Sequence, residues 1–517
     1  MAAGPPGDPA APLTKRETRC PRRTVESGEC PAVAGTGRSE ATHRSRPILF
    51  PTFQFAAFFL PVFVLCWVLR PRLLAWKLVL VLASYLFYLG WGWRATAVLA
   101  ASTLANHAIA WLMGGTAARD GRRRALLATG VALNLAALAW FKYYGFFVVV
   151  LDDTLRTLGI SASLPFLEIL APIGISFFTF RAIAYVVDVY RGSLKPAGLL
   201  DVALLMSFFP CVAAGPIVRG GELFPQFTRT GPPFRLDSSQ AFALFLSGLI
   251  KKLVIADFLA RNLVDPVFAT PGSYASPDVL AAVLGYAVQI YCDFSGYIDM
   301  ALGVALLLGI NLPPNFNAPY TATSPRDFWH RWHMTLSRFL RDYLYIPLGG
   351  SRGSTLATYR NLMVTMLLAG LWHGAAWTFV LWGGIHGAAL LVEHWWRSIS
   401  PRPRRRTTCM PARILTFAFV ALAWIPFRAE SLTGAWRVFA RLFTAWGDPA
   451  VLLSGWAVAA IALGIAMQYL PRTPGRRIRA AFSRLHPVVQ GLILAAAIFG
   501  IDALGPQGVA QFIYFQF

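Results

Sequence analysis

The sequence predicts an all-α integral membrane protein, a polytopic helical bundle of roughly 11–13 membrane helices with additional re-entrant or interfacial helices. Of the 517 residues, 56% are hydrophobic and only 14% are charged, whereas a soluble domain is about 45–50% apolar and about 25% charged. From Ile48 onward, apolar runs of about 18–22 residues recur, each long enough to cross roughly 30 Å of hydrocarbon. Because lipid offers no partner for an unpaired backbone group, these runs must be helical.

Residues 1–47 precede these runs and are polar and rich in Pro, Gly, Arg and Thr. Such a segment cannot bury enough apolar surface to order itself, so we expect a disordered tail. It has no apolar core of its own and therefore does not resemble a cleavable signal peptide. A start codon assigned too far upstream would produce the same stretch. We divide the chain into this tail and one membrane domain, residues 48–517.

The membrane domain divides at its apolar runs. The clearest predicted spans are 48–69, 73–92, 95–113, 125–147, 169–190, 410–427, 451–470 and 487–504. Further helical material is expected at 199–217, 239–263, 278–310 and 357–396.

Basic residues between the spans orient the chain. The formal net charge is +23, and Lys and Arg gather in alternate loops, as the positive-inside pattern requires. The clusters are Arg70 and Arg72; Arg119, Arg122, Arg123 and Arg124; Arg191 and Lys195; Arg402 and Arg404 to Arg406; and Arg472, Arg476, Arg477 and Arg479. If these basic loops are cytoplasmic, the first span begins outside and the chain ends outside, so both termini are expected to be extracytoplasmic, although the basic tail opposes this orientation. The clusters also favour membrane lipid, and not nucleic acid, as the partner of the positive charge.

The stretch 311–360 breaks the membrane pattern. Ser324, Pro325 and Asp327 have the order of a helix start, with Ser as N-cap. We predict one amphipathic helix from there to about Tyr345. Its apolar face would carry Phe328, Trp332, Leu336 and Phe339, and its basic face Arg331, Arg338 and Arg341. Such a helix lies at the cytoplasmic interface, either as an anchor or as part of a site.

Two histidines mark the candidate catalytic centre. His333 lies beside Trp329 and Trp332, and His373 lies in an apolar run between Gly370 and Gly374. An ionisable residue at membrane depth is costly and therefore suggests a function, and the two glycines permit close approach by a neighbour or a ligand. The alternative for His373 is a buried histidine that hydrogen-bonds a carbonyl.

Other polar side chains in apolar segments are Asp293, Asp299, His386 and His394. They either line a cavity or join helices, and for Asp299 we favour the second role. His330 and His333 have a spacing that can place both on one helix face, but no Glu or Cys lies at ligand spacing and Arg331 between them opposes a cation. We therefore expect no metal site. The six cysteines imply no disulfide framework.

Four ordered motifs resemble those of the membrane-bound O-acyltransferases: YCDFSGYIDMALG (291–303), NFNAPY (315–320), SPRDFWHRWHMTLSRFLRDYLYIPLGG (324–350) and GLWHG (370–374). The resemblance covers essentially 48–517 and is strongest to the alginate O-acetylase and peptidoglycan O-acetylase branch. It implies a helical bundle around a transmembrane tunnel with two histidines near its middle. The family commonly has FWRRWH where this chain has FWHRWH, so His330 replaces an arginine, and contact with donor phosphates is weakened.

The resemblance implies catalytic roles for His373 and His333, with no bound cofactor. His373 would take the proton of an attacking hydroxyl as general base, and His333 would position the donor or stabilise the oxyanion. The donor would be acetyl-CoA or another acyl thioester, with its phosphates at Arg326, Arg331, Arg338 and Arg341; positive-inside orientation explains these arginines equally well. Asp293, Asp299 and His386 would be polar residues of the tunnel or of the structure around it.

Residues 512–517, FIYFQF, resemble a terminal hexapeptide of this family and of a small partner in teichoic-acid D-alanylation, whose tyrosine is thought to carry the acyl group outward. Tyr514 holds the only hydroxyl among them, and a phenol can form a covalent acyl intermediate. The implied route runs from the donor to Tyr514, then to an extracytoplasmic serine-type partner acetyltransferase and a polysaccharide acceptor. The alternative is a set of aromatic residues at the membrane interface.

Several functions remain open at this point. The acceptor is an alginate-like exopolysaccharide, which we favour, or peptidoglycan, and the donor is a coenzyme A thioester or an acyl group on a carrier protein. A proton-coupled transporter would also place histidines inside a bundle, but transporters often show inverted repeats, and no such internal symmetry is visible here. No Walker-type or GxSxG motif supports ATP hydrolysis or serine-hydrolase chemistry.

Overall fold

The computed structural model describes residues 50–116, 120–160, 164, 167, 169–228, 237–400, 409–504 and 512–513. These residues belong to one compact unit, Ser45–Phe517. They form helices and connections, and no β-strand occurs among them. The predicted all-α fold is confirmed. The predicted tail, residues 1–47, lies outside the described residues.

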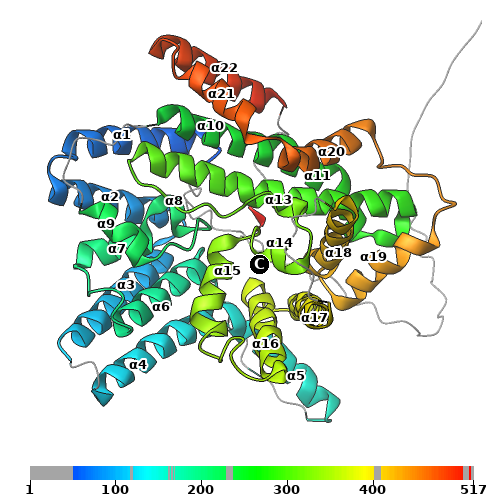
Figure 1. The fold of residues 1–517 in the computed structure, drawn as a ribbon, viewed down its shortest axis with the longest axis horizontal. Coiled ribbons are helices and arrows are strands. Elements are labelled where there is room, and N and C mark those ends of the chain that lie inside the picture. Colours follow the sequence, from blue (N-terminus) through cyan, green and yellow to red (C-terminus); the bar gives the residue numbers. More distant parts are fainter. Residues whose placement is uncertain are drawn as a thin grey trace, which may run out of the picture. The chain divides into compact units, whose positions relative to one another are not determined.

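The first part of the bundle is built from helices α1 to α9 (Figure 1). They are α1 (Phe53–Leu69), α2 (Leu73–Leu89), α3 (Trp93–Gly114), α4 (Gly121–Leu138), α5 (Tyr144–Thr157), α6 (Ile175–Tyr190), α7 (Leu199–Ser207), α8 (Phe209–Val212) and α9 (Gly220–Phe227). A π-helical segment, η1 (Ala139–Tyr143), joins α4 to α5. Asn106 of α3 and Asn134 of α4 exchange side-chain hydrogen bonds of 3.3 and 2.7 Å, the kind of polar contact that holds helices together in lipid.

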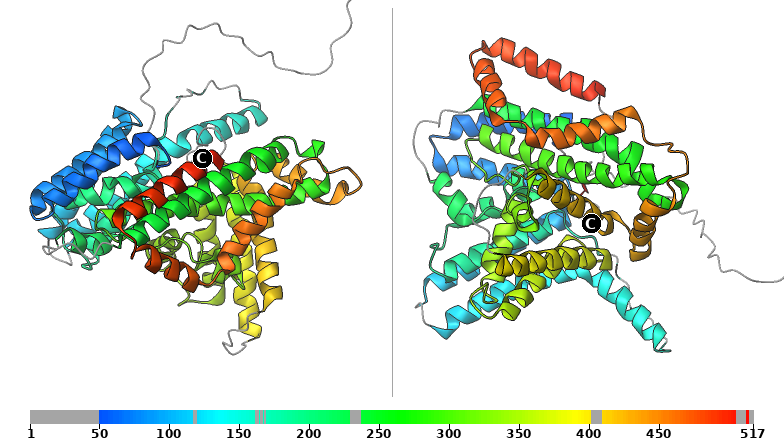
Figure 2. Two further views of the ribbon diagram at one scale, coloured as in Figure 1. Left: turned by 90° about the horizontal axis from the view of Figure 1, so that it is seen from above. Right: turned by 45° about the vertical axis from the view of Figure 1, so that its right-hand side comes forward.

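The remaining elements complete the bundle. They are α10 (Ser238–Leu249), η2 (Ile250–Ala256), α11 (Asp257–Leu259), η3 (Ala260–Val264), α12 (Asp265–Ala269), η4 (Pro271–Ser273), α13 (Ser276–Leu307), η5 (Pro319–Thr321), α14 (Pro325–Trp329), α15 (Met334–Leu340), η6 (Arg341–Tyr345), α16 (Thr355–His373), α17 (Trp377–Ile399), α18 (Met410–Arg428), α19 (Leu432–Thr444), α20 (Gly455–Tyr469), α21 (Arg472–Phe482) and α22 (Pro487–Leu504). The long helix α13 packs against α10, α18, α19 and α20 and lies among them in two further views (Figure 2).

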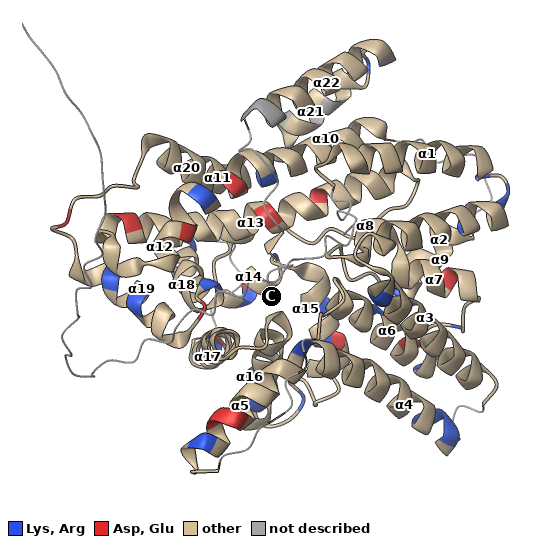
Figure 3. Ribbon diagram, turned by 180° about the vertical axis from the view of Figure 1, so that it is seen from behind, with Lys and Arg blue, Asp and Glu red and all other residues tan. Residues whose placement is uncertain are grey.

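Several described helices are suited to lipid. Trp93–Gly114, Gly121–Thr157, Ser276–Leu307 and Met410–Arg428 are long and apolar enough to cross a membrane, and Phe53–Leu69, Leu73–Leu89, Gly455–Tyr469 and Val488–Ile501 are shorter apolar helices. Large apolar side chains such as Leu82, Leu86 and Trp111 are more than 60% exposed, which suits contact with lipid but not with water. Long stretches of helix carry no charge, and acidic positions on α13 interrupt this pattern (Figure 3). The chain is built as a polytopic membrane bundle.

The single amphipathic helix predicted for 324–345 is wrong. The structure divides it into α14, α15 and the π-helical η6. Its predicted start is correct, because the Ser324 side chain accepts a hydrogen bond from the backbone N–H of Asp327. The division lies at His333, whose φ of 42° is left-handed. The preceding loop inserts there: Asn317 N–H donates to the carbonyl of Arg331, and Met334 N–H donates to the carbonyl of Asn315.

Helices α16 and α17 form a close antiparallel pair because glycines line their contact. A Cβ atom added at Gly370 would lie 2.2 Å from the carbonyl oxygen of Phe379, and one at Gly383 would lie 2.4 Å from that of Met366. Both distances are shorter than any real Cβ contact, so only glycine permits this approach. The pair holds the end of α16, and therefore His373, against α17.

Candidate active site

His373 is the last residue of α16 and lies inside an aromatic cluster. Only 3% of its surface is exposed. Its ring makes edge-on contacts with the rings of Trp372, Trp382 and Phe427, with centroids 4.9, 5.0 and 5.1 Å away. The helix ends there because Gly374 is extended, with φ −159° and ψ 151°. His373 therefore lies at the carbonyl end of a helix, where the helix dipole favours positive charge.

His333 is fully buried and lies where the predicted helix is divided. Its ring faces Phe294 and Trp372, with centroids 4.8 and 6.0 Å away. A left-handed backbone is uncommon for a residue other than glycine and persists where surrounding contacts over-determine it. The side-chain oxygen of Asn315 supplies such contacts, since it lies 3.3 Å from His333 Nδ1 and accepts hydrogen bonds of 3.0 Å from the backbone N–H and hydroxyl of Thr335.

This contact fixes the tautomer of His333. The backbone N–H of Thr335 can only donate, so the Asn315 atom facing it must be the oxygen, Oδ1. That oxygen can only accept, so Nδ1 of His333 must carry a proton and donate to it. In the neutral imidazole, Nε2 is then an acceptor. His333 in this state is suited to receive a hydrogen bond from a hydroxyl and not to donate one to an oxyanion.

Trp372 connects the two histidines. Its ring contacts the rings of both His333 and His373. Beside it lies a cavity of about 90 Å³, lined by residues of η1, α6 and α16, of the segment before α6, and of the end of α8. The lining residues are Lys142, Ala171, Pro172, Ile173, Gly174, Ile175, Ser176, Phe177, Ala213, Trp372 and His373. Its volume is of the order of a small acyl group plus water. The structure thus brings the two predicted catalytic residues into one buried cluster.

Asp293 and Asp299 of α13 both pair with lysines of η2. Asp293 lies 2.8 Å from Lys252, which also contacts Asp257 at 2.8 Å, and Asp299 lies 2.6 Å from Lys251. A buried carboxylate requires such partners. The consecutive lysines therefore join η2 to α13 through two ion pairs.

Asp293 has a second contact, with residues near the end of the sequence. Its Oδ2 accepts a hydrogen bond of 2.8 Å from the backbone N–H of Ile513. The neighbouring Phe512 stacks on Tyr297 at 4.8 Å and contacts Phe294 at 5.9 Å. Phe294 in turn contacts His333, so segment 512–513 lies one aromatic ring away from a predicted catalytic residue. Tyr514, the predicted acyl carrier, lies outside the described residues.

His386 of α17 lies close to the histidine pair but separate from the cavity. It is fully buried between Trp329 and Trp382, with ring centroids 5.2 and 4.9 Å away. Trp382 also contacts His373, so one tryptophan connects both rings. Neither ring nitrogen of His386 has a hydrogen-bond partner among the residues that the structure describes.

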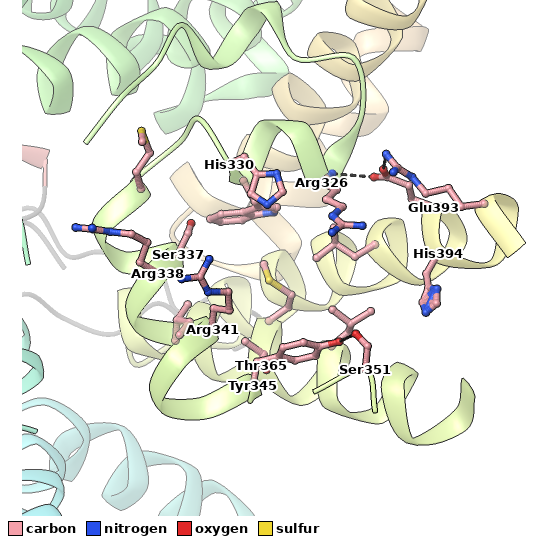
Figure 4. A pocket seen from close by; sticks show the side chains of 17 residues that line it. Arg326, His330, Ser337, Arg338, Arg341, Tyr345, Ser351, Thr365, Glu393 and His394 are labelled. Atoms are coloured by element: carbon pink, nitrogen blue, oxygen red, sulfur yellow. Dashed lines mark hydrogen bonds and ion pairs between the residues drawn. The ribbon is translucent and has the colours of Figure 1, made fainter. Parts of the chain in front are cut away.

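A second cavity, of about 420 Å³, is lined by basic residues of α14, α15, η6 and α17 (Figure 4). Its lining includes Arg326, Arg338 and Arg341, three of the four predicted donor-binding arginines, together with His330, Tyr345, Ser351, Glu393, His394 and Arg397. Figure 4 shows Arg326, His330 and Arg341 around the same space. Met334, the residue after His333, also lines it, and so does Trp329, whose ring contacts that of Trp382, a neighbour of His373. The cavity therefore approaches the histidine cluster.

The fourth arginine, Arg331, does not line this cavity. Its Nε donates to Asp327 at 2.8 Å, and its guanidinium faces the carbonyl of Asn317. Arg341 contacts Asp342 at 2.6 Å, and Arg219 shares the same carboxylate. Burial acts to raise the pKa of Asp342, but hydrogen bonds from Arg341 and Arg219 outweigh it and hold the pKa below its usual value.

His330 lines the cavity where the family commonly has arginine. Burial and the neighbouring charge of Arg326 lower the pKa of His330 below its ordinary value. The imidazole is therefore mainly neutral near pH 7. The substitution removes a positive charge from the cavity as well as shortening the side chain.

Three contributors to this region were missed in the sequence. Lys142 of η1, Asn315 and Lys252 each contact a predicted site residue. Lys142 stands alone in the apolar run 125–147, and an ionisable residue in such a run is itself a signal of function. Among the described residues, no group of three His, Cys, Asp or Glu side chains is arranged to hold a metal ion.

Comparison with known proteins places this geometry in a family. The model of the membrane-bound O-acyltransferase family matches residues 87–429, which include both histidines, Lys142 and the basic cavity. The chain belongs to this family. Membership makes it a multi-pass membrane protein and an O-acyltransferase enzyme, as the resemblance of its motifs implied.

Individual members of the family are similar to this chain over most of their own length. The chain is 41% identical to a probable alginate O-acetylase of Azotobacter vinelandii, over 78% of this chain and 79% of the relative. It is 39% identical to a peptidoglycan O-acetyltransferase of Helicobacter pylori, over 76% of this chain and 79% of that enzyme. A teichoic acid D-alanyltransferase of Streptococcus thermophilus is 27% identical to the chain, over 56% of this chain and 75% of that enzyme. The chain is thus a family member with relatives that differ in acceptor.

Proposed function

We propose that this O-acyltransferase takes an acetyl group from a cytoplasmic thioester, acetyl-CoA or an equivalent, and passes it outward for O-acetylation of an extracytoplasmic polysaccharide. An alginate-like exopolysaccharide is the favoured acceptor, and the bacterial inner membrane is the location. The observation that carries this proposal is the buried cluster of His333, His373 and Trp372, with a basic cavity approaching it and segment 512–513 close beside it. We assign the activity to residues 48–517.

The chemistry follows from the two histidines. A hydroxyl is a weak nucleophile, and His373 takes its proton as the oxygen attacks the thioester carbonyl. The tetrahedral intermediate then expels the thiolate, which takes the proton back from the imidazolium. His333 has the role of positioning the donor, with Nε2 as a hydrogen-bond acceptor, because the single proton of the attacking hydroxyl is directed at His373. Burial excludes water, which would otherwise hydrolyse the thioester.

The attacking hydroxyl in this proposal is that of Tyr514. Ile513, its neighbour, is held by Asp293, and Phe512 lies against Phe294, which contacts His333. Segment 512–513 therefore brings the chain beside the histidine cluster immediately before Tyr514. O-acetyl-Tyr514 would then pass its acetyl group to an extracytoplasmic serine-type acetyltransferase. This route requires the C-terminal segment to lie on the extracytoplasmic side, as the positive-inside pattern predicts.

The function is tested by expression in a strain that lacks its own polysaccharide O-acetylase but keeps the partner proteins. We expect the chain to restore O-acetyl groups to the exopolysaccharide, measured by nuclear magnetic resonance of the purified polymer. Purified protein should also consume acetyl-CoA. If peptidoglycan became acetylated and the exopolysaccharide did not, peptidoglycan would be the acceptor. If the protein were active only with an acylated carrier protein, that protein and not acetyl-CoA would be the donor.

The basic cavity predicts how the donor binds. The double substitution Arg326→Ala and Arg341→Ala should raise the KM for acetyl-CoA about tenfold or more, because each removed arginine costs about 1–2 kcal/mol of charge-assisted contact with phosphate. Arg331→Ala should raise it less than about threefold, since Arg331 faces Asp327 and not the cavity. Steady-state kinetics at two salt concentrations measure both. An equal effect of the two changes would contradict this assignment of the cavity.

A further inference from the structure

A short π-helical segment holds the end of the helix that carries His373. Lys142 Nζ of η1 donates to the carbonyl oxygens of Trp372 and His373 at 2.7 and 2.8 Å. The hydroxyl of the next residue, Tyr143, donates to the carbonyl of Leu371 at 2.8 Å. These three successive carbonyls belong to the last turn of α16, where no intrahelical N–H is available to them. Single-turn π segments inside α-helices occur frequently at functional sites.

No carboxylate pairs with Lys142 among the residues that the structure describes. Within the described part of the chain, its contacts are the two carbonyl oxygens and the ring of Trp372, whose centroid lies 5.9 Å from Nζ. Elsewhere in the bundle, the buried Lys251 and Lys252 each pair with aspartate. A buried cation balanced only by carbonyl dipoles is costly. It creates a positive potential beside His373, and such a potential stabilises negative charge that develops nearby.

Lys142 also lines the cavity that His373 lines. An ammonium group has three N–H donors, and two are engaged with the carbonyls of Trp372 and His373, which leaves one for a further acceptor. His333 does not compete for this role, because the contact with Asn315 makes its Nε2 an acceptor. Ser176 lines the cavity too, but its hydroxyl is neutral and hydrogen bonds from charged donors are roughly twice as strong.

We propose that Lys142 is a catalytic residue whose third N–H stabilises the oxyanion of acyl transfer in the cavity of about 90 Å³. This inference rests on the proposed function. As the hydroxyl oxygen bonds to the thioester carbon, the carbonyl electron pair moves onto oxygen next to Lys142, and the hydroxyl proton moves to His373. Collapse restores the carbonyl, breaks the C–S bond, and returns the proton to the leaving thiolate. Lys142 keeps its own protons throughout.

The test is Lys142→Met, which keeps the length and removes the charge and the donors. We expect kcat for acetyl-CoA consumption by the purified full-length protein to fall about 10²–10³-fold, with the KM for acetyl-CoA within threefold of wild type. Lys142→Arg, which keeps a charged donor, should recover at least part of this loss. Melting temperatures show whether each variant is folded.

Tyr143→Phe is the matched control, because it removes a hydrogen bond to α16 from the adjacent residue without touching the cavity lining. We expect it to lower kcat less than about threefold. Equal losses in Lys142→Met and Tyr143→Phe would reduce Lys142 to a structural brace, and wild-type kcat in Lys142→Met would overturn the proposal. If the melting temperature of Lys142→Met is clearly below that of the wild type, the kcat of Lys142→Gln is compared with that of Tyr143→Phe instead. A wild-type protein that never consumes an acyl thioester would instead refute the proposed function.

Discussion

Replacing His373 with alanine is expected to lower the rate of acetyl transfer about 10²–10⁴-fold, the contribution of a positioned general base. The ring of His373 lies at the end of α16, beside the cavity and against Trp372, and no other histidine lines that cavity. The measurement is acetyl-CoA consumption by purified protein, together with the O-acetyl content of the polysaccharide. The amount in the membrane and the melting temperature should stay near wild type.

Two further variants separate catalysis from packing. His373→Asn keeps a planar polar side chain among Trp382 and Phe427 but cannot take a proton, so it should be as inactive as the alanine variant. His486→Ala, at an exposed turn, should keep full activity. More than about a tenth of wild-type activity in His373→Ala would exclude a role as general base.

Tyr514→Phe is expected to abolish O-acetylation of the polysaccharide while leaving the protein folded, because it removes only the oxygen that forms the ester. The contacts that hold the preceding residues, Ile513 to Asp293 and Phe512 to Tyr297, do not involve this oxygen. Mass spectrometry of the C-terminal peptide should show an added acetyl group in the wild type incubated with acetyl-CoA and none in Tyr514→Phe.

Tyr469→Phe serves as the control for loss of a phenol oxygen, since Tyr469 donates only to the carbonyl of Tyr320 at 3.2 Å. It should retain most of the activity. Wild-type acetylation in Tyr514→Phe would refute the role of Tyr514 as acyl carrier. Direct transfer of the acetyl group to a partner protein or to the sugar would then be the remaining route. That result would not affect the role of His373, which is needed for any hydroxyl acceptor.

The helices were predictable because their signal is local. A run such as 410–427 is apolar throughout, and the structure forms α18 over Met410–Arg428. The division of the predicted helix 324–345 was not predictable from periodicity, since Phe328, Trp332 and Leu336 keep helical spacing and are all buried. It depends on a loop residue, Asn315, that captures backbone and side-chain donors around His333.

The site was predictable in its residue types and less so in its contacts. Motifs singled out His333 and His373, and the fold brings both against Trp372. Four arginines in one basic segment were equivalent in sequence, but only three line the basic cavity, because Asp327 holds Arg331 elsewhere. Lys142 lies 231 positions before His373, and no spacing rule connects residues so far apart.

The π-helical segment η1 also limits how the gene can change in length. Deleting one residue from Ala139–Tyr143 would turn the widened stretch into ordinary α-helix and preserve the hydrophobic length of 121–157. The helices on either side would keep their orientation, because the widened turn accommodates one extra residue, but the residues within the segment would change position. Lys142 and Tyr143 would then leave the carbonyls that they hold. Substitutions here can be conservative, but insertions and deletions cannot, even though hydropathy would register no difference.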